Sequence, residues 1–173
     1  MKKRSIYILL FFVGILLGGC DNADDGGYAK PITIYEKVKG DWSLTSIKMV
    51  DEYAKANSIK PDEQDLTNWF NYNTFVLQLN VDEENTPTSY KVLGEVPALF
   101  SADGFWDLSS AFTNTDLSAV KINLYTDVSK TQRTDQLLLI STPGSNEKME
   151  IQLVRKVNQV VYASYVFTLT PAN

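Results

Sequence analysis

Few side chains in this 173-residue chain could carry out chemistry, because it contains no histidine and a single cysteine, Cys20. Without histidine, Ser–His and Cys–His catalysis, imidazole acid–base chemistry and most zinc sites are excluded. The sequence also lacks a glycine-rich phosphate-binding loop. We therefore expect no cofactor and no metal site, and the remaining candidates for chemistry are carboxylates.

Three acidic residues, Glu95, Asp103 and Asp107, gather in the stretch GEVPALFSADGFWDL. A pair of carboxylates is the minimum that glycoside hydrolysis requires. Acidic residues in loops more commonly face solvent or form turns. We therefore predict that the chain is not an enzyme and that it has no catalytic residue.

Cys20 follows an apolar N-terminal segment. Residues 2–4 are basic, and residues 6–17 are mostly apolar, a run shorter than the roughly 20 residues of a membrane span and typical of a signal peptide. Residues 17–20 (LGGC) resemble the lipobox of bacterial lipoproteins, in which the cysteine sulfur is acylated and becomes the first residue. This resemblance implies a lipoprotein signal peptide over 1–19 and a lipid anchor on Cys20. Acylation also explains why the chain needs no second cysteine.

Asp21, Asp24 and Asp25 come directly after this cysteine. The acidic cluster resembles the export signal that takes lipoproteins of some Gram-negative gut anaerobes to the outer face of the outer membrane. Its composition also fits a flexible acidic tether, which we predict over 20–31, and the two interpretations are compatible. We expect a protein that is lipid-anchored in the outer membrane and faces the cell surface.

The charge and length of the rest of the chain limit its partners and its size. Removal of residues 1–19 would take away three of the 16 basic residues and none of the 21 acidic ones, which leaves 13 against 21 and a net charge of about −8. No basic stripe remains, so we expect no nucleic-acid partner. Residues 32–173 fit one domain, which at this size buries roughly 68–70% of its unfolded surface and needs no disulfides.

From residue 32 onward the dominant signal is alternation of apolar and polar residues with period two, which is typical of half-buried strands. Such alternation is clear in the stretches FVLQLNV and MEIQLV. Eight short antiparallel strands predict an all-β fold, a closed barrel or a sandwich, because closure removes exposed edges. The expected strands are 42–49, 75–81, 90–93, 105–108, 120–124, 136–140, 149–154 and 163–169.

One segment departs from this alternation. Pro61 and the two acidic residues after it favour the start of a helix, and Leu66, Trp69 and Phe70 recur at helical spacing. We therefore predict a short amphipathic helix between the first two strands. The stretch 94–104 is expected to be an irregular loop with its apolar residues tucked beneath it.

Residues 40–42 (GDW), which open the first expected strand, are similar to the G-x-W signature of lipocalin-like barrels. Together with the lipobox and the acidic leader, they make the chain resemble a lipocalin-like lipoprotein family of unknown function from Gram-negative gut anaerobes, over roughly residues 32–173. The resemblance implies an antiparallel barrel of about eight strands whose closed end is plugged by Trp42. The chain departs from secreted lipocalins in the inserted helix, at residues 125–127 (YTD in place of T-D-Y), and after Arg155, where no further arginine follows to pack across Trp42. The fold follows from the resemblance, whereas the ligand does not.

Aromatic residues make up 12% of the chain. Trp69 and Tyr72 lie at the end of the expected helix, and Trp106 is adjacent to Phe105 on an expected strand, so that one of these two rings lies outside the core or beneath a loop. An exposed ring beside polar groups can stack on a sugar or on a hydrophobic ligand. The alternative is that these rings close the barrel ends as part of the core. We take Trp69, Tyr72 and Trp106 as candidate ligand-binding residues.

Three hypotheses about function follow from the sequence. The first is a surface glycan-binding accessory protein that works with outer-membrane transport partners. The second is a carrier of a small hydrophobic ligand, and the third is a structural or accessory lipoprotein with protein partners only. Bulky residues expected to face inward, such as Phe75 and Phe167, fill a small barrel and favour a binding surface at its rim over a large cavity.

Overall fold

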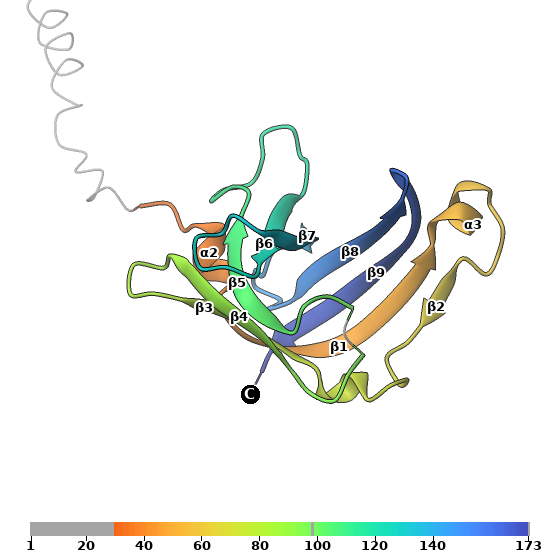
Figure 1. Cartoon of the computed structure of the whole chain (residues 1–173), viewed down its shortest axis with the longest axis horizontal. Helices are drawn as coiled ribbons and strands as arrows, with labels where there is room; N and C mark the ends of the chain where they lie inside the picture. Colours follow the sequence, from red (N-terminus) through yellow and green to blue (C-terminus); the bar gives the residue numbers. More distant parts are fainter. Residues whose placement is uncertain (1–29, 98, 173) are drawn as a thin grey trace, which may run out of the picture. The chain divides into compact units, whose positions relative to one another are not determined.

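An antiparallel sheet that closes on itself dominates the computed structural model, which describes residues 30–97 and 99–172 (Figure 1). Hydrogen-bonded neighbours follow the order β2-β1-β3-β4-β5-β6-β7-β8-β9, and β1 also pairs with β9. The predicted all-β barrel is therefore confirmed, with eight strands in the closed barrel and β2 as an extra strand beside β1. The strands are β1 (Gly40–Asp51), β2 (Glu63–Asp65), β3 (Val76–Val81), β4 (Pro87–Leu93), β5 (Asp103–Leu108), β6 (Val120–Tyr125), β7 (Arg133–Ser141), β8 (Met149–Val157) and β9 (Val160–Pro171).

The eight predicted strands are the eight strands of the barrel, because the alternation in the sequence matches alternation in burial. In β8, Met149, Ile151 and Leu153 are buried, whereas the residues between them are partly exposed. The inward-facing side chains of all the barrel strands meet in one hydrophobic core, which begins in sequence at Ile34. The core and the closing strand pairs lie within residues 32–173, so we expect the barrel to fold without the N-terminal segment.

Closure of the barrel depends on β1, which is long enough to pair on both of its edges. One edge runs along β9, with Leu44 opposite Leu169 and Ile47 opposite Phe167. The other edge is divided, because residues 40–43 pair with β3 and residues 48–50 pair with β2. A register shift between Leu44 and Ser46 marks the place where the ladder with β9 is irregular.

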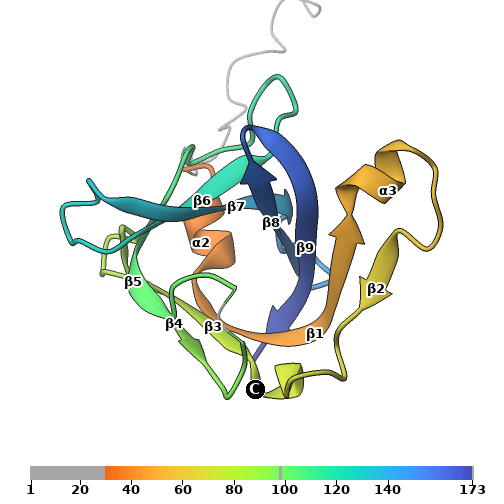
Figure 2. The same cartoon turned by 45° about the vertical axis from the view of Figure 1, so that its right-hand side comes forward.

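A short helix before the first strand, α2 (Ile34–Val38), closes one end of the barrel and lies within the ring of strands in Figure 2. Thr33 caps it: the Glu36 amide donates to the Thr33 hydroxyl (3.3 Å), and the Thr33 amide donates to the Glu36 carboxylate (2.6 Å). This capping box holds the helix in place while Ile34 and Val38 are buried. The helix was not predicted, although the spacing T-x-x-E in residues 33–36 was the signal for it.

The predicted helix at residues 61–70 is wrong in position. A short helix does lie between the first two strands, but it is α3 (Glu52–Ala56), capped by Asp51. Residues 63–65 pair with β1 instead, and the Leu66 amide then donates to the Ile47 carbonyl (2.9 Å). Phe70 has a φ of 55°, a left-handed conformation that an α-helix does not contain. The pairing with β1 overrode the helical spacing of the apolar residues.

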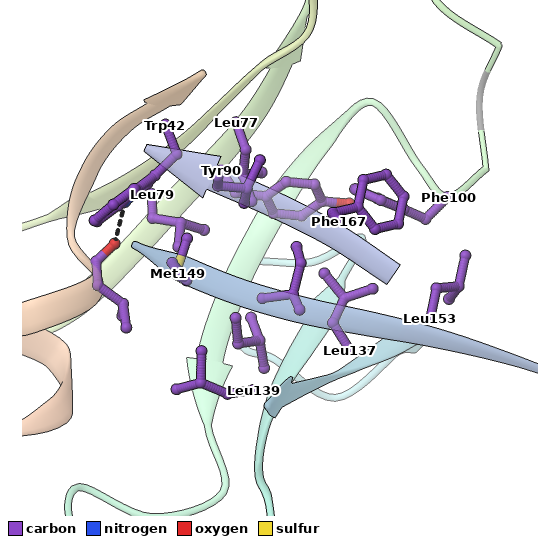
Figure 3. Packing of buried hydrophobic residues seen from close by; sticks show 14 of the residues in the cluster. Trp42, Leu77, Leu79, Tyr90, Phe100, Leu137, Leu139, Met149, Leu153 and Phe167 are labelled. Atoms are coloured by element: carbon purple, nitrogen blue, oxygen red, sulfur yellow. Dashed lines mark hydrogen bonds between the residues drawn. The ribbon is translucent and has the colours of Figure 1, made fainter. Parts of the chain in front are cut away.

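Trp42 occupies the α2 end of the core, as the resemblance to lipocalin-like barrels implies. Its side chain is buried, and its indole N–H donates to the Val38 carbonyl at 2.7 Å, so that the strand and the helix are fastened together. In Figure 3 Trp42 and Phe100 lie at opposite ends of the buried cluster. We call the end at Phe100 the barrel mouth.

Trp42→Ala is expected to lower the free energy of unfolding by about 3–5 kcal/mol, because it removes a large buried side chain and the hydrogen bond to α2. Chemical denaturation of the purified protein measures this change. Trp69→Ala is the matched control, since Trp69 is exposed, and it should change the stability by no more than about 0.5 kcal/mol. A similar small loss in both variants would show that Trp42 does not hold the closed end.

Candidate functional site

The three aromatic residues predicted to bind a ligand do not form one platform. Trp106 is 0% exposed and its indole N–H donates to the Asn80 carbonyl (2.8 Å), while Tyr72 is 2% exposed. Stacking needs an open ring face, so neither residue is placed to stack on a sugar, although Tyr72 lines the apolar pocket at the barrel mouth. Trp69 is 56% exposed, and its ring centroid lies 6.3 Å from that of the exposed Phe70.

Asp103 and Asp107, two of the three acidic residues near β5, are too far apart to act as a catalytic pair. Asp103 and Asp107 lie four residues apart on one strand, which separates them by about 13 Å, whereas glycosidase carboxyl groups lie about 5–9.5 Å apart. Asp107 accepts a hydrogen bond from the Tyr35 hydroxyl (2.9 Å) and lies 3.8 Å from the Lys130 ammonium. Burial, followed by this hydrogen bond, raises the pKa of Tyr35 to about 12. Asp107 thus has structural partners that account for its position.

The barrel mouth is formed by aromatic rings from three parts of the chain. The Phe167 ring on β9 lies 5.7 Å from the Phe75 ring and 6.1 Å from the Phe100 ring, the latter in an edge-on arrangement. Phe100 belongs to the β4–β5 loop (residues 94–102), and it is buried, as the sequence predicted for the apolar residues of this loop. The mouth is therefore covered by a loop side chain and not by a strand.

An apolar pocket of about 60 Å³ lies between this loop and the barrel. Pockets that hold drug-sized ligands have volumes of about 300–1,000 Å³, so the pocket takes such a molecule only if loop side chains move. The residues that line it include Tyr72, Phe75, Val92, Leu99, Phe100 and Phe167.

The loop is held over the mouth mainly through its backbone. Gly94 begins it with a φ of +103°, and a Cβ atom there would lie 2.3 Å from the Thr74 carbonyl oxygen, so only glycine fits. The Tyr90 hydroxyl donates to the Ser101 carbonyl at 3.1 Å, and the Arg155 guanidinium donates to the Leu99 carbonyl. Carbonyl groups of the loop thus accept hydrogen bonds from two inward-facing polar side chains of the barrel, Tyr90 and Arg155.

Arg155 and Asp135 form an ion pair at the same mouth, with Nη1 and Oδ1 3.0 Å apart. Burial raises the pKa of Tyr90 to about 12, and the neighbouring carboxylates Asp135 and Asp103 contribute to the increase. Sequence reasoning missed this polar group. The alternation of apolar and polar residues indicates that both side chains face inward, because positions 135 and 155 continue the inward-facing positions of β7 and β8.

The described part of the chain has neither a cluster of metal-binding side chains nor a membrane-spanning helix. Residues 30–97 and 99–172 contain no group of three or more acidic side chains placed to share a metal ion. Within the same residues, no helix combines the length and the apolar character of a membrane span. The predicted lipidation site Cys20 and the predicted export signal (Asp21, Asp24 and Asp25) lie outside the described residues.

The fold and the site define a closed antiparallel β-barrel domain, an architecture consistent with ligand binding. The chain belongs to the family described as Domain of unknown function (DUF5004), whose model matches residues 19–170. A comparison with curated proteins found no match.

Tyr90 predicts how stability depends on pH at the alkaline end. The folded state keeps the phenol proton until about pH 12, whereas the unfolded chain ionises near 10.0, so stability is complete below pH 10 and falls as the pH rises toward 12. In Tyr90→Phe this loss should be smaller between about pH 10 and about pH 12. Urea denaturation at each pH measures it. Tyr53→Phe, at an exposed tyrosine, should follow the wild type, and identical curves for all three proteins would contradict the prediction.

Proposed function

We propose that this chain is a lipid-anchored binding protein of the cell envelope whose barrel mouth takes up a small apolar ligand. The observation that carries the proposal is the apolar pocket between Phe75, Phe100 and Phe167. The opposite end of the barrel is filled by α2 and Trp42, so ligand entry there would require disruption of the core.

The energetics of the mouth favour displacement of the loop side chains by a ligand. Moving the Phe100 ring into water costs about 1.5–3 kcal/mol, whereas a ligand with roughly eight methylene groups gains about 0.8 kcal/mol for each one that it buries. The gain of about 6 kcal/mol exceeds the cost of exposing the ring, and the difference offsets part of the cost of association. A pocket that is small in the free protein is therefore compatible with a larger apolar ligand.

The cellular location in the proposal rests on the N-terminal sequence. The lipobox resemblance supports acylation of Cys20, and the acidic residues Asp21, Asp24 and Asp25 support export to the outer face of the outer membrane. In this proposal the barrel binds its ligand without catalysis and without nucleic acid. The anchor would keep the barrel at the membrane, where apolar molecules are concentrated.

A second candidate function is glycan binding at the surface, which Trp69 and Phe70 favour. Their side chains are 56% and 60% exposed, and the two rings are tilted by 43° relative to each other. Exposed rings of this kind can stack on sugar faces. In this second proposal the chain would act as an accessory protein beside outer-membrane transport partners.

Cys20→Ala should abolish incorporation of labelled palmitate into the protein in cells, because no other thiol is present for acylation. Autoradiography of the immunoprecipitated protein measures the label. Asp21→Ala, Asp24→Ala and Asp25→Ala in combination are the matched control, and they should leave acylation unchanged while reducing cleavage by protease added to intact cells. Labelling that persists in Cys20→Ala would refute the anchor.

Phe100→Ala should bind the neutral fluorophore 1-N-phenylnaphthylamine about tenfold more tightly than the wild type, because the ligand no longer has to displace a ring. Fluorescence titration of a soluble chain that begins at residue 21 gives both affinities. A purely structural role for Phe100 would lower stability without this gain in affinity.

Phe105→Ala serves as the control for this titration, since Phe105 lies on β5 away from the pocket lining, and it should bind like the wild type. Unchanged or weaker binding in Phe100→Ala would overturn the apolar-ligand proposal. If a glycan panel binds instead and Trp69→Ala abolishes that binding, the second candidate function is favoured.

A further inference from the structure

The wall of the barrel opens between β7 and β8. The ladder between these strands extends from Ser141 and Glu150 to Leu137 and Leu153 and stops there, although both strands continue toward the mouth. A cleft of about 590 Å³ occupies the place where they separate. We call it the β7–β8 cleft, and its lining includes Lys121, Arg133, Asp135, Leu153, Arg155 and Lys156.

The charge of this cleft is opposite to that of the protein. The whole chain has a formal net charge of −5, yet the lining of the cleft contains four basic side chains and one acidic side chain, Asp135. Basic groups collected in a concave surface concentrate the positive potential and attract anions. The cleft is therefore suited to an anionic ligand group.

Arg155 connects the cleft to the apolar pocket of the mouth. Its side chain is 33% exposed and lines the cleft, where Nη1 lies 3.0 Å from Asp135 Oδ1. Its Nη2 donates to the carbonyl of Leu99, a residue that lines the apolar pocket. The cationic cleft and the apolar pocket thus share a boundary made by these two residues.

Displacement of Leu99 and Phe100 by a ligand would leave two inward-facing donors without acceptors. These are Nη2 of Arg155, whose Nη1 stays on Asp135, and the Tyr90 hydroxyl, which now donate to the carbonyls of Leu99 and Ser101. Leaving such partly buried donors unpaired is unfavourable, so a ligand that brings its own acceptor oxygens is preferred over a purely apolar one. A carboxylate offers two acceptor oxygens in a plane, which match one side of a guanidinium.

We propose that the ligand of the barrel mouth is an amphipathic carboxylate, with its apolar tail in the mouth pocket and its carboxylate on Arg155 at the β7–β8 cleft. This inference rests on the proposed function and specifies its ligand class. Asp135 is a positioning residue that holds the other side of the guanidinium, and its negative charge disfavours ligands with more than one negative charge. Arg133 and Lys156 add positive potential without direct contact.

The experiment compares decanoate with decanol, which have the same chain length and differ in the charge of the head group. Competition against 1-N-phenylnaphthylamine on the soluble chain from residue 21, at neutral pH and low salt, gives both affinities. Decanoate should bind at least about tenfold more tightly than decanol, a ratio that one charge-assisted hydrogen bond accounts for. Arg155→Met should reduce this ratio to about one while decanol still binds.

The ratio of the two affinities is the readout because it does not change if Arg155→Met merely loosens the loop. Lys156→Gln should lower the ratio by about twofold, because it weakens the positive potential of the cleft. It replaces Arg155→Met in the experiment if circular dichroism shows that Arg155→Met does not fold. Lys91→Met, at an exposed lysine on β4 outside the cleft, should leave the ratio unchanged.

Different negative results would contradict different parts of the proposal. Equal binding of decanoate and decanol by the wild type would overturn the carboxylate inference and leave the apolar-ligand function standing. Absence of binding by both molecules and by the fluorophore would refute the proposed function itself. A preference for decanoate that is undiminished in both Arg155→Met and Lys156→Gln would overturn the assignment of the cleft.

Discussion

The pairing of β1 with β9 is the constraint on which the other features of the barrel depend. It joins the first barrel strand to the last one and removes the two edges that an open sheet would expose. The same ladder fixes both ends of the core. At one end it places Trp42 against α2, and at the other it places Phe167 between Phe75 and Phe100.

The two ends of the barrel are closed by different interactions, and the candidate site lies at the end that a loop covers. At the α2 end, the indole N–H groups of Trp42 and Trp106 are tied to backbone carbonyls and the rings are fully packed. At the mouth, a loop is tied to the barrel by two side chains, Tyr90 and Arg155. The proposed ligand would replace what the loop supplies there, because the hydrogen bonds end on loop carbonyls and not on a second strand.

Strand positions could be predicted from the sequence because burial of one face of each strand makes apolar and polar residues alternate along the chain. The segment from Pro61 to Phe70 was misread because its apolar spacing suits a helix, whereas a distant strand, β1, decided its conformation. Trp106 could not be assigned to the core or the surface from alternation alone, since Phe105 fits either face equally well. The ion pair of Arg155 and Asp135 was not predicted, because two residues that come together only in the folded barrel form no motif in the sequence.

Closure between the first and last strands also sets when the chain can become a folded protein. The Thr45 hydroxyl donates to the Thr168 carbonyl across a separation of 123 residues, and contacts of such long range form late because a large loop must first be closed. A nascent chain that lacks β9 therefore keeps both edges open and has no completed core. Such a chain cannot complete its fold before β9 has been synthesised, which is compatible with the proposed export across a membrane before folding.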